Sequence, residues 1–78
     1  MKKIQILGSG CKKCNELTAN AEKAAQTAGV EFQIEKITQL NDIMAFGVMT
    51  TPGLVIDGKV ISQGKLLSAD QVAEHLKG

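Results

Sequence analysis

Cys11 and Cys14, separated by two residues, are the only cysteines in the chain and the side chains best suited to chemistry. A Cys-x-x-Cys sequence between an apolar strand and a helix, in a small α/β chain, favours dithiol/disulfide redox chemistry. One helical turn would bring the second sulfur close enough to the first for a bridge. Unpaired N–H groups and the helix dipole at the helix start favour a thiolate on Cys11. Lys12 and Lys13 add positive charge beside it, although exposed lysines of this kind are equally well interpreted as solvated side chains.

Metal capture is the main alternative chemistry for the same pair, and the absence of any chemical role is a third. Soft thiolate ligands suit Cu(I) and Zn(II), so the alternative is a carrier that binds such a metal through both cysteines. A structural zinc site uses four ligands, and one Cys-x-x-Cys with the single His75 does not supply them within one chain. We therefore expect no structural zinc site within a single chain, while a metal shared between two chains stays open.

The composition fits one small globular domain over residues 1–78. Hydrophobic residues make up 44% of the chain, but with only two phenylalanines the core must rest on aliphatic side chains. A formal net charge of +1 gives no sign of a nucleic-acid or membrane surface. The apolar runs are too short for a signal peptide or a membrane span, so we expect a cytoplasmic monomer. Paired cysteines in that compartment are usually catalytic, redox-sensing or metal-binding.

The elements that must position the cysteines follow from the apolar pattern and its end signals. We expect a central strand over 3–7, a helix over about 11–28, a strand over 30–37, a short helix over 38–46, a hairpin of 54–56 and 59–61, and a last helix from 69 onward. The end signals are Thr38 as an N-cap, Gly29 and Gly47 as helix stops, the turn Asp57-Gly58, and the capping box Ser68-x-x-Gln71. The order β-α-β-α-β-β-α makes the first two strands parallel and the hairpin antiparallel, which gives a mixed four-stranded sheet flanked by helices.

Helical periodicity separates the roles of the two sulfurs. At about 3.6 residues per turn, the apolar face of the first helix consists of Cys14, Leu17, Thr18, Ala21, Ala25 and Ala28. Cys11 lies off this face at the open end of the helix. The pattern therefore predicts an exposed, attacking sulfur on Cys11 and a sheltered, resolving sulfur on Cys14. We interpret Met44 and Met49 as core residues, with a soft substrate surface as the alternative.

The element order, the position of Cys-x-x-Cys and the Thr51-Pro52 dipeptide together resemble the thioredoxin/glutaredoxin superfamily. The chain is most similar to the small bacterial and archaeal thioredoxin-like proteins called redox-active disulfide proteins, whose second signature resembles residues 47–58. This resemblance covers essentially the whole chain and implies the α/β thioredoxin fold. It also implies a thiol–disulfide oxidoreductase or electron carrier, acting on protein or small-molecule disulfides and recycled by a reductase or a thiol reductant.

Carried onto this sequence, the resemblance implies Cys11 as the nucleophile and Cys14 as the resolving cysteine, with no cofactor besides their disulfide. It implies a cis-proline at Pro52 beside that disulfide, and a Thr51 backbone that pairs with an extended substrate segment. We also expect Gly10, Lys12 and Lys13 to support the site around the nucleophile. The sequence departs from true thioredoxins in two places: Gly-Cys-Lys-Lys-Cys replaces Trp-Cys-Gly-Pro-Cys, and Gln5 stands where thioredoxins carry a buried acid.

The heavy-metal-associated domain is the rival family, because it also presents Cys-x-x-Cys just after its first strand. That family usually carries Met-x-Cys-x-x-Cys and ends on a strand. Here Ser9-Gly10 precedes Cys11, a helical pattern follows the second strand, and the last expected element is a helix. These differences favour the redox interpretation.

Overall fold

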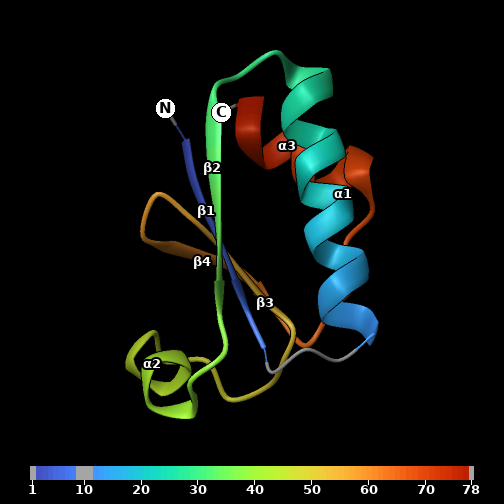
Figure 1. Cartoon of the computed structure of the whole chain (residues 1–78). Helices are drawn as coiled ribbons and strands as arrows, with labels where there is room; N and C mark the ends of the chain where they lie inside the picture. Colours follow the sequence, from blue (N-terminus) through green and yellow to red (C-terminus); the bar gives the residue numbers. More distant parts are fainter. Residues whose placement is uncertain (1, 9–11, 78) are drawn as a thin grey trace.

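Within residues 2–8 and 12–77, the part of the chain that the computed structural model describes, four strands form one mixed sheet in the order β2-β1-β3-β4 (Figure 1). The strands are β1 (Lys2–Leu7), β2 (Phe32–Ile37), β3 (Gly53–Ile56) and β4 (Lys59–Gln63), and the helices are α1 (Lys12–Ala28), α2 (Leu40–Ala45) and α3 (Ala69–Lys77). β1 is parallel to β2 and antiparallel to β3, and β3 is antiparallel to β4. The expected element order, the mixed sheet and the central first strand are confirmed.

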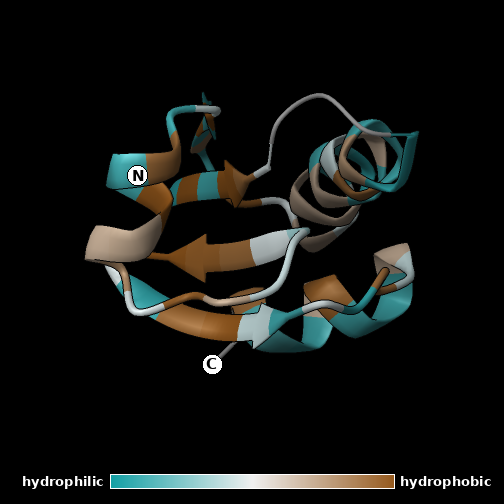
Figure 2. Cartoon of the chain, turned by 90° about the horizontal axis from the view of Figure 1, so that it is seen from below, coloured by the Kyte–Doolittle hydropathy of each residue, from teal (hydrophilic) through white to brown (hydrophobic). Residues whose placement is uncertain are grey.

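The two faces of the sheet are covered by different helices. Side chains alternate along β1, so Ile4 and Ile6 face one side, where α1 and α3 pack against the sheet and against each other. Leu7 faces the other side and packs with Ile43 of α2 in a smaller cluster. Figure 2 shows hydrophobic residues concentrated on the strands and hydrophilic residues on the outer sides of the helices. Burial on both faces explains why Ile4, Ile6 and Leu7 are all apolar, although Leu7 points to the opposite side of the sheet from the two isoleucines.

α1 buries one face made mainly of small residues. Its buried residues are Cys14, Leu17, Thr18, Ala21, Ala24 and Ala25. This set adds Ala24 to the predicted face, and Ala28 is only partly buried. Burying Leu17 alone contributes about 1.5–3 kcal/mol relative to an exposed position. Within the described residues no helix, α1 included, is long and apolar enough to cross a membrane.

Several predicted boundaries shift by one or two residues, and two of these shifts have a local reason. The second strand begins at Phe32, because the Val30 amide donates to the Ala25 carbonyl at 3.2 Å and completes the end of α1. The short helix begins at Leu40, with Gln39 and not Thr38 at its N-cap and no side-chain capping bond. Ile37 is still in register with Leu7, so the chain uses the two residues after it to leave the strand before the helix starts.

The end signals in the C-terminal half are confirmed. The Ser68 amide donates to Gln71 Oε1 at 2.9 Å, and the Gln71 amide donates to Ser68 Oγ at 3.2 Å. These reciprocal bonds are those of a capping box at the start of α3. Asp57 and Gly58 have φ values of 52° and 82°, the positive values that a two-residue hairpin turn requires.

Candidate active site

Cys14 is 4% exposed and lies in the first turns of α1, on the face that packs against the sheet. Its sulfur lies against the backbone of Gly8, the residue that follows β1. A Cβ added to Gly8 would overlap Cys14 Sγ and would lie 3.4 Å from Cys14 Cβ. The Gly8 amide donates to the Ile37 carbonyl at 2.9 Å, which ties this backbone to the end of β2. The predicted shelter of this sulfur is therefore confirmed, and it depends on a glycine at position 8.

Gly10 and Cys11 lie outside the described residues, so their places at the tip of the helix stay predictions. Lys12 and Lys13 are the first residues of the described part of α1, and both are exposed. No acidic residue stands in the first turn of this described helix. The positive end of the helix dipole and two ammonium charges therefore lie at the same end of α1, an arrangement that favours an anion.

The Thr51–Pro52 peptide bond is cis, the form that the family resemblance implied. The Pro52 side chain is fully buried immediately before β3, whose first residue, Gly53, is in register with Leu7 at the end of β1. Thr51 is exposed, and its Cβ lies 3.7 Å from the place that a Gly8 Cβ would take. Cys14 and Thr51, distant in sequence, thus approach the same point beside Gly8.

The backbone that leads into Pro52 is held from the end of β4. The Gly64 amide donates to the Pro52 carbonyl at 2.8 Å, and the Gln63 side-chain oxygen accepts from the Met49 amide at 3.0 Å. In the described part of the chain, neither the amide nor the carbonyl of Thr51 hydrogen-bonds to another backbone group. An exposed peptide group of this kind can pair with an incoming extended chain. Gln63 was not predicted, because a side-chain bond between loop and strand leaves no periodic pattern in the sequence.

Gln5 takes the place of the buried acid of thioredoxins and is 8% exposed. Its side-chain amide donates a hydrogen bond to Glu35 Oε1 at 3.0 Å. Glu35 is the residue of β2 in register with Gln5. Since Ile4 and Ile6 face α1, the alternation along β1 turns Gln5 toward the other face of the sheet. A glutamine amide is not ionisable, and this one also faces away from α1, so Gln5 cannot accept the proton of the Cys14 thiol.

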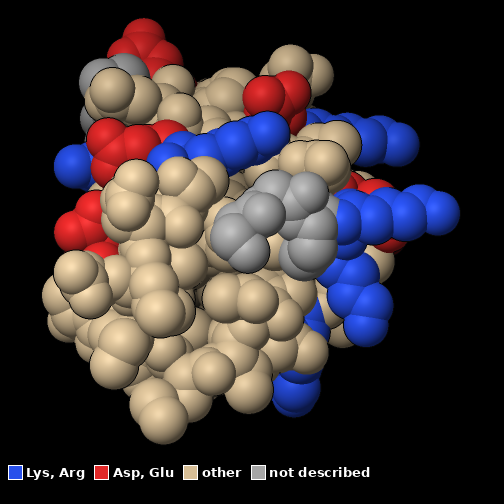
Figure 3. Space-filling view, turned by 60° about the horizontal axis from the view of Figure 1, so that its bottom comes forward, with Lys and Arg blue, Asp and Glu red and all other residues tan. Residues whose placement is uncertain are grey.

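The surface at this end of the molecule divides into an uncharged side and a lysine-rich side. Figure 3, which brings this end forward, shows a broad area without charged side chains and lysines gathered beside it. Met44 on α2 is 58% exposed and Met49 is 86% exposed. Leu40, one helical turn before Met44 and 68% exposed, shares its face of α2. The interpretation of Met44 and Met49 as core residues is wrong, and their exposure fits the alternative of a soft apolar surface.

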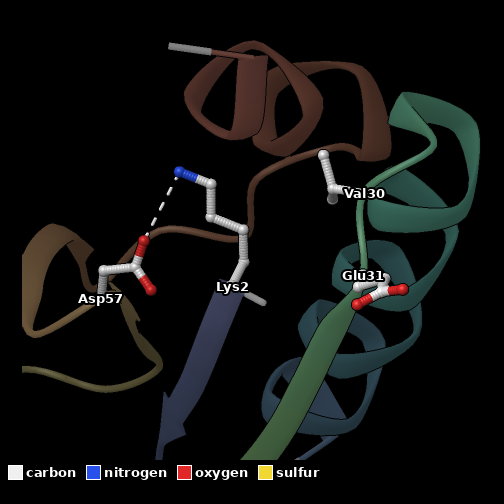
Figure 4. Close-up of a pocket in the computed structure, with 4 residues that line it drawn as sticks. All are labelled: Lys2, Val30, Glu31 and Asp57. Carbon is white, nitrogen blue, oxygen red and sulfur yellow. Dashed lines mark ion pairs between the residues drawn. The ribbon is translucent and has the colours of Figure 1, made fainter.

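The opposite end of β1 carries charges with a structural role. A cavity of about 410 Å³ is lined there by Lys2, Val30, Glu31 and Asp57 (Figure 4). Asp57 Oδ1 accepts from the Lys3 amide at 2.9 Å, and Asp57 Oδ2 lies 3.5 Å from Lys2 Nζ. The hydrogen bond from the Lys3 backbone, helped by the Lys2 charge, lowers the pKa of Asp57 below its ordinary value. These contacts fasten the hairpin turn to the start of β1.

Among the described residues, no three His, Cys, Asp or Glu side chains are grouped so that they could hold a metal ion. His75 is exposed on α3 and lines a cavity together with Lys2 and Asp57, at the end of β1 that lies away from Gly8. Cys11 lies outside the described residues, so a carrier that binds metal through both cysteines stays a prediction.

The fold and this arrangement are those of a thioredoxin-like protein. A family model for the thioredoxin domain matches residues 2–77, and the chain belongs to that family. The thioredoxin of Methanocaldococcus jannaschii is 38% identical over 74 residues, which cover 95% of this chain and 85% of the relative. The thioredoxin of Methanothermobacter thermautotrophicus is 36% identical over 76 residues, which cover 97% of this chain and 99% of the relative.

A solved structure supports the fold independently of sequence identity. The structure titled "Structure of a malarial protein" matches with a TM-score of 0.73 at 12% identity, covering 99% of this chain and 94% of that chain. At so low an identity the match speaks for the fold alone. The predicted superfamily and the α/β thioredoxin fold are confirmed.

Proposed function

We propose that this protein is a thiol–disulfide oxidoreductase in which Cys11 and Cys14 exchange a dithiol for a disulfide with protein or small-molecule disulfides. A thioredoxin-like redox function is supported by the family match and by thioredoxin relatives aligned over almost the whole chain. The observation that carries the finer proposal is the position of Cys14. It is buried three residues after Cys11, against Gly8 and near the exposed Thr51.

The exchange consists of two substitutions at sulfur. The Cys11 thiolate attacks one sulfur of the substrate disulfide; that S–S bond breaks, a mixed disulfide forms, and the first substrate thiolate leaves. The Cys14 thiolate then attacks the Cys11 sulfur, which forms the Cys11–Cys14 bond and releases the second substrate thiolate. The two released thiolates take up protons from water. The substrate gains two electrons and the protein loses two, which an external dithiol or a reductase returns.

The described residues support different roles for the two cysteines in these steps. Burial keeps the Cys14 sulfur away from bulky disulfides, so attack from outside falls to Cys11. The unpaired peptide group of Thr51 suits a substrate segment bound as an added strand. Lys12 and Lys13 favour the anionic state of Cys11 together with the helix dipole. The same chemistry serves an electron carrier in the reducing cytoplasm, where we place this protein.

Trapping of the mixed disulfide tests the order of attack. Insulin supplies the disulfide, and the protein is examined by mass spectrometry without added reductant. We expect Cys14→Ser to accumulate a covalent adduct on Cys11, because nothing remains to resolve it. The matched control, Cys11→Ser, is expected to form no adduct and to have no reductase activity. Full activity of Cys11→Ser would overturn the proposal.

A redox titration of the metal-free protein separates this function from the metal-carrier alternative. The protein is equilibrated in graded thiol/disulfide buffers, alkylated and weighed. We expect a two-electron transition between roughly −180 and −300 mV, the range of cycling dithiols. If the thiols instead stay reduced in oxidising buffers and bind Cu(I) or Zn(II) stoichiometrically, the metal-carrier function would replace the proposed oxidoreductase function.

A further inference from the structure

The segment before Pro52 is fixed to β4 by a side chain at the point where the strand ladder ends. Gly53 and Gln63 are the last register pair of β3 and β4. One backbone bond continues past them, from the Gly64 amide to the Pro52 carbonyl at 2.8 Å. For Met49 the acceptor is the Gln63 side-chain oxygen, at 3.0 Å from the amide nitrogen. The Gln63 side chain thus accepts the hydrogen bond that a backbone carbonyl would accept if the strand pairing continued to Met49.

Thr50 packs against the same end of β4. A Cβ on Gly64 would lie 2.7 Å from Thr50 Oγ1 and 3.2 Å from Thr50 Cβ, so the loop closes onto a position without a side chain. Met49 and Pro52 are therefore hydrogen-bonded to Gln63 and Gly64, and Thr50 packs beside Gly64. The exposed Thr51 lies between these anchors with its peptide groups unpaired in the described structure.

We infer that Gln63 is a positioning residue that sets how Thr51 receives an extended peptide segment carrying the substrate disulfide. The inference rests on the proposed function. Gln63 acts through the Met49 backbone and has no part in the reactions at sulfur. If the Met49 amide were released, the backbone on the N-terminal side of Thr51 would lose its fixed direction, and an incoming strand would have to order it on binding. A small disulfide without a peptide chain needs no such pairing, so its reaction is independent of Gln63.

Three variants isolate the acceptor oxygen of Gln63. Gln63→Leu keeps a side chain of similar size and removes the acceptor. Gln63→Glu keeps an acceptor oxygen at the same distance along the side chain and serves as the rescue. The matched control is Gln33→Leu, which removes an exposed glutamine on β2 whose side chain makes no hydrogen bond within the described residues.

The steady-state kinetics of insulin reduction, driven by dithiothreitol, are compared with those of a small aryl disulfide. We expect Gln63→Leu to raise KM for insulin about 3- to 10-fold, the effect of one lost hydrogen bond, with kcat unchanged. The rate with the aryl disulfide is expected to stay at the wild-type value. Gln63→Glu and Gln33→Leu are expected to behave as wild type toward both substrates.

Amide hydrogen exchange at Met49, followed by NMR, reports the anchor itself without reference to activity. We expect faster exchange in Gln63→Leu and wild-type exchange in the other two variants. An unchanged KM for insulin in Gln63→Leu, or equal losses with both disulfides, would overturn the positioning role. A wild-type protein that reduces neither disulfide would show instead that the proposed function has failed, and the inference with it, whatever the exchange at Met49.

Discussion

The sulfur of Cys14 occupies the place that a Cβ on residue 8 would take. Gly8 follows β1 directly, and its amide is bonded to the Ile37 carbonyl, so this backbone cannot withdraw without losing a hydrogen bond. The central strand and the first helix therefore meet at the buried cysteine itself. The geometry of the site depends on the same contact that packs α1 against the sheet.

Gly8→Ala is predicted to damage both stability and the resolving step. The φ angle of Gly8 is outside the left-handed region, so alanine is conformationally allowed and the effect comes from overlap with Cys14. Overpacking of this kind costs about 1–3 kcal/mol, which urea denaturation measures. Displacement of the Cys14 sulfur should also prolong the life of the mixed disulfide in a quenched-flow assay. Wild-type stability in this variant would contradict the described contact.

Gly64→Ala is predicted to lower the activity toward insulin by more than its loss of stability alone would cause. Gly64 has φ +72°, and Thr50 fills the space where its Cβ would lie. Gly29→Ala is the matched control, because Gly29 has φ +69° and no atom within 4 Å of its Cβ position. Both substitutions carry the left-handed cost of roughly 1–2 kcal/mol. Only Gly64→Ala displaces the loop, so equal activities of the two variants would argue against a role for this packing.

Asp57→Asn is predicted to remove a pH-dependent part of the stability. The pKa of Asp57 is lowered in the folded protein, chiefly by the Lys3 amide, so the ionised carboxylate favours folding. This contribution is complete above the unfolded pKa of about 3.9 and is lost as the pH falls through the lowered folded value. Asparagine tolerates the positive φ of 52° at this position, which leaves the turn intact.

The stability difference between Asp57→Asn and wild type should therefore be present at pH 6 and shrink as the pH falls below about 4. Urea unfolding across this range gives the difference directly. Glu22→Gln, which neutralises an exposed carboxylate on α1, is the control for the loss of one negative charge. A constant difference for Asp57→Asn would contradict the role of its charge.

Ser68→Ala is predicted to destabilise the protein by about 0.5–2 kcal/mol through loss of the N-cap of α3. The Gln71 amide would lose its partner at 3.2 Å, although the reverse bond from the Ser68 amide could persist. Thermal unfolding measures the loss. Ser68→Asp should restore most of the stability, because its carboxylate can accept the same bond; a failure of this rescue would point to packing in place of capping.

The predictions from sequence that succeeded rest mostly on local signals, although the local N-cap signal at Thr38 failed. The apolar run of β1, the turn Asp57-Gly58 and the capping box Ser68-x-x-Gln71 each specify their structure within a few residues. The shelter of Cys14 followed from its position one turn into an amphipathic helix. The fold and the burial of Cys14 can therefore be predicted from the order and spacing of the residues.

Contacts between distant residues could not be predicted in this way. The Gln63–Met49 and Lys3–Asp57 hydrogen bonds join residues 14 and 54 positions apart, and no periodicity reveals them. The prediction that Met44 lies in the core rests on the tendency of methionines near a short helix to fill core space. The exposure of Met44 follows from the packing of α2, a six-residue helix that buries only Ile43.

The sheet has two edge strands, β2 and β4. Exposed Glu35 and Lys36 lie along β2, and exposed Lys59 begins β4. Charged side chains on an edge strand discourage other chains from adding to it, which protects a β protein from aggregation. Residues 49–51 carry no charge, so a foreign strand meets no such deterrent there. Under the proposed function, the charged edge strands discourage pairing between copies, while the uncharged loop before β3 stays open to a substrate strand.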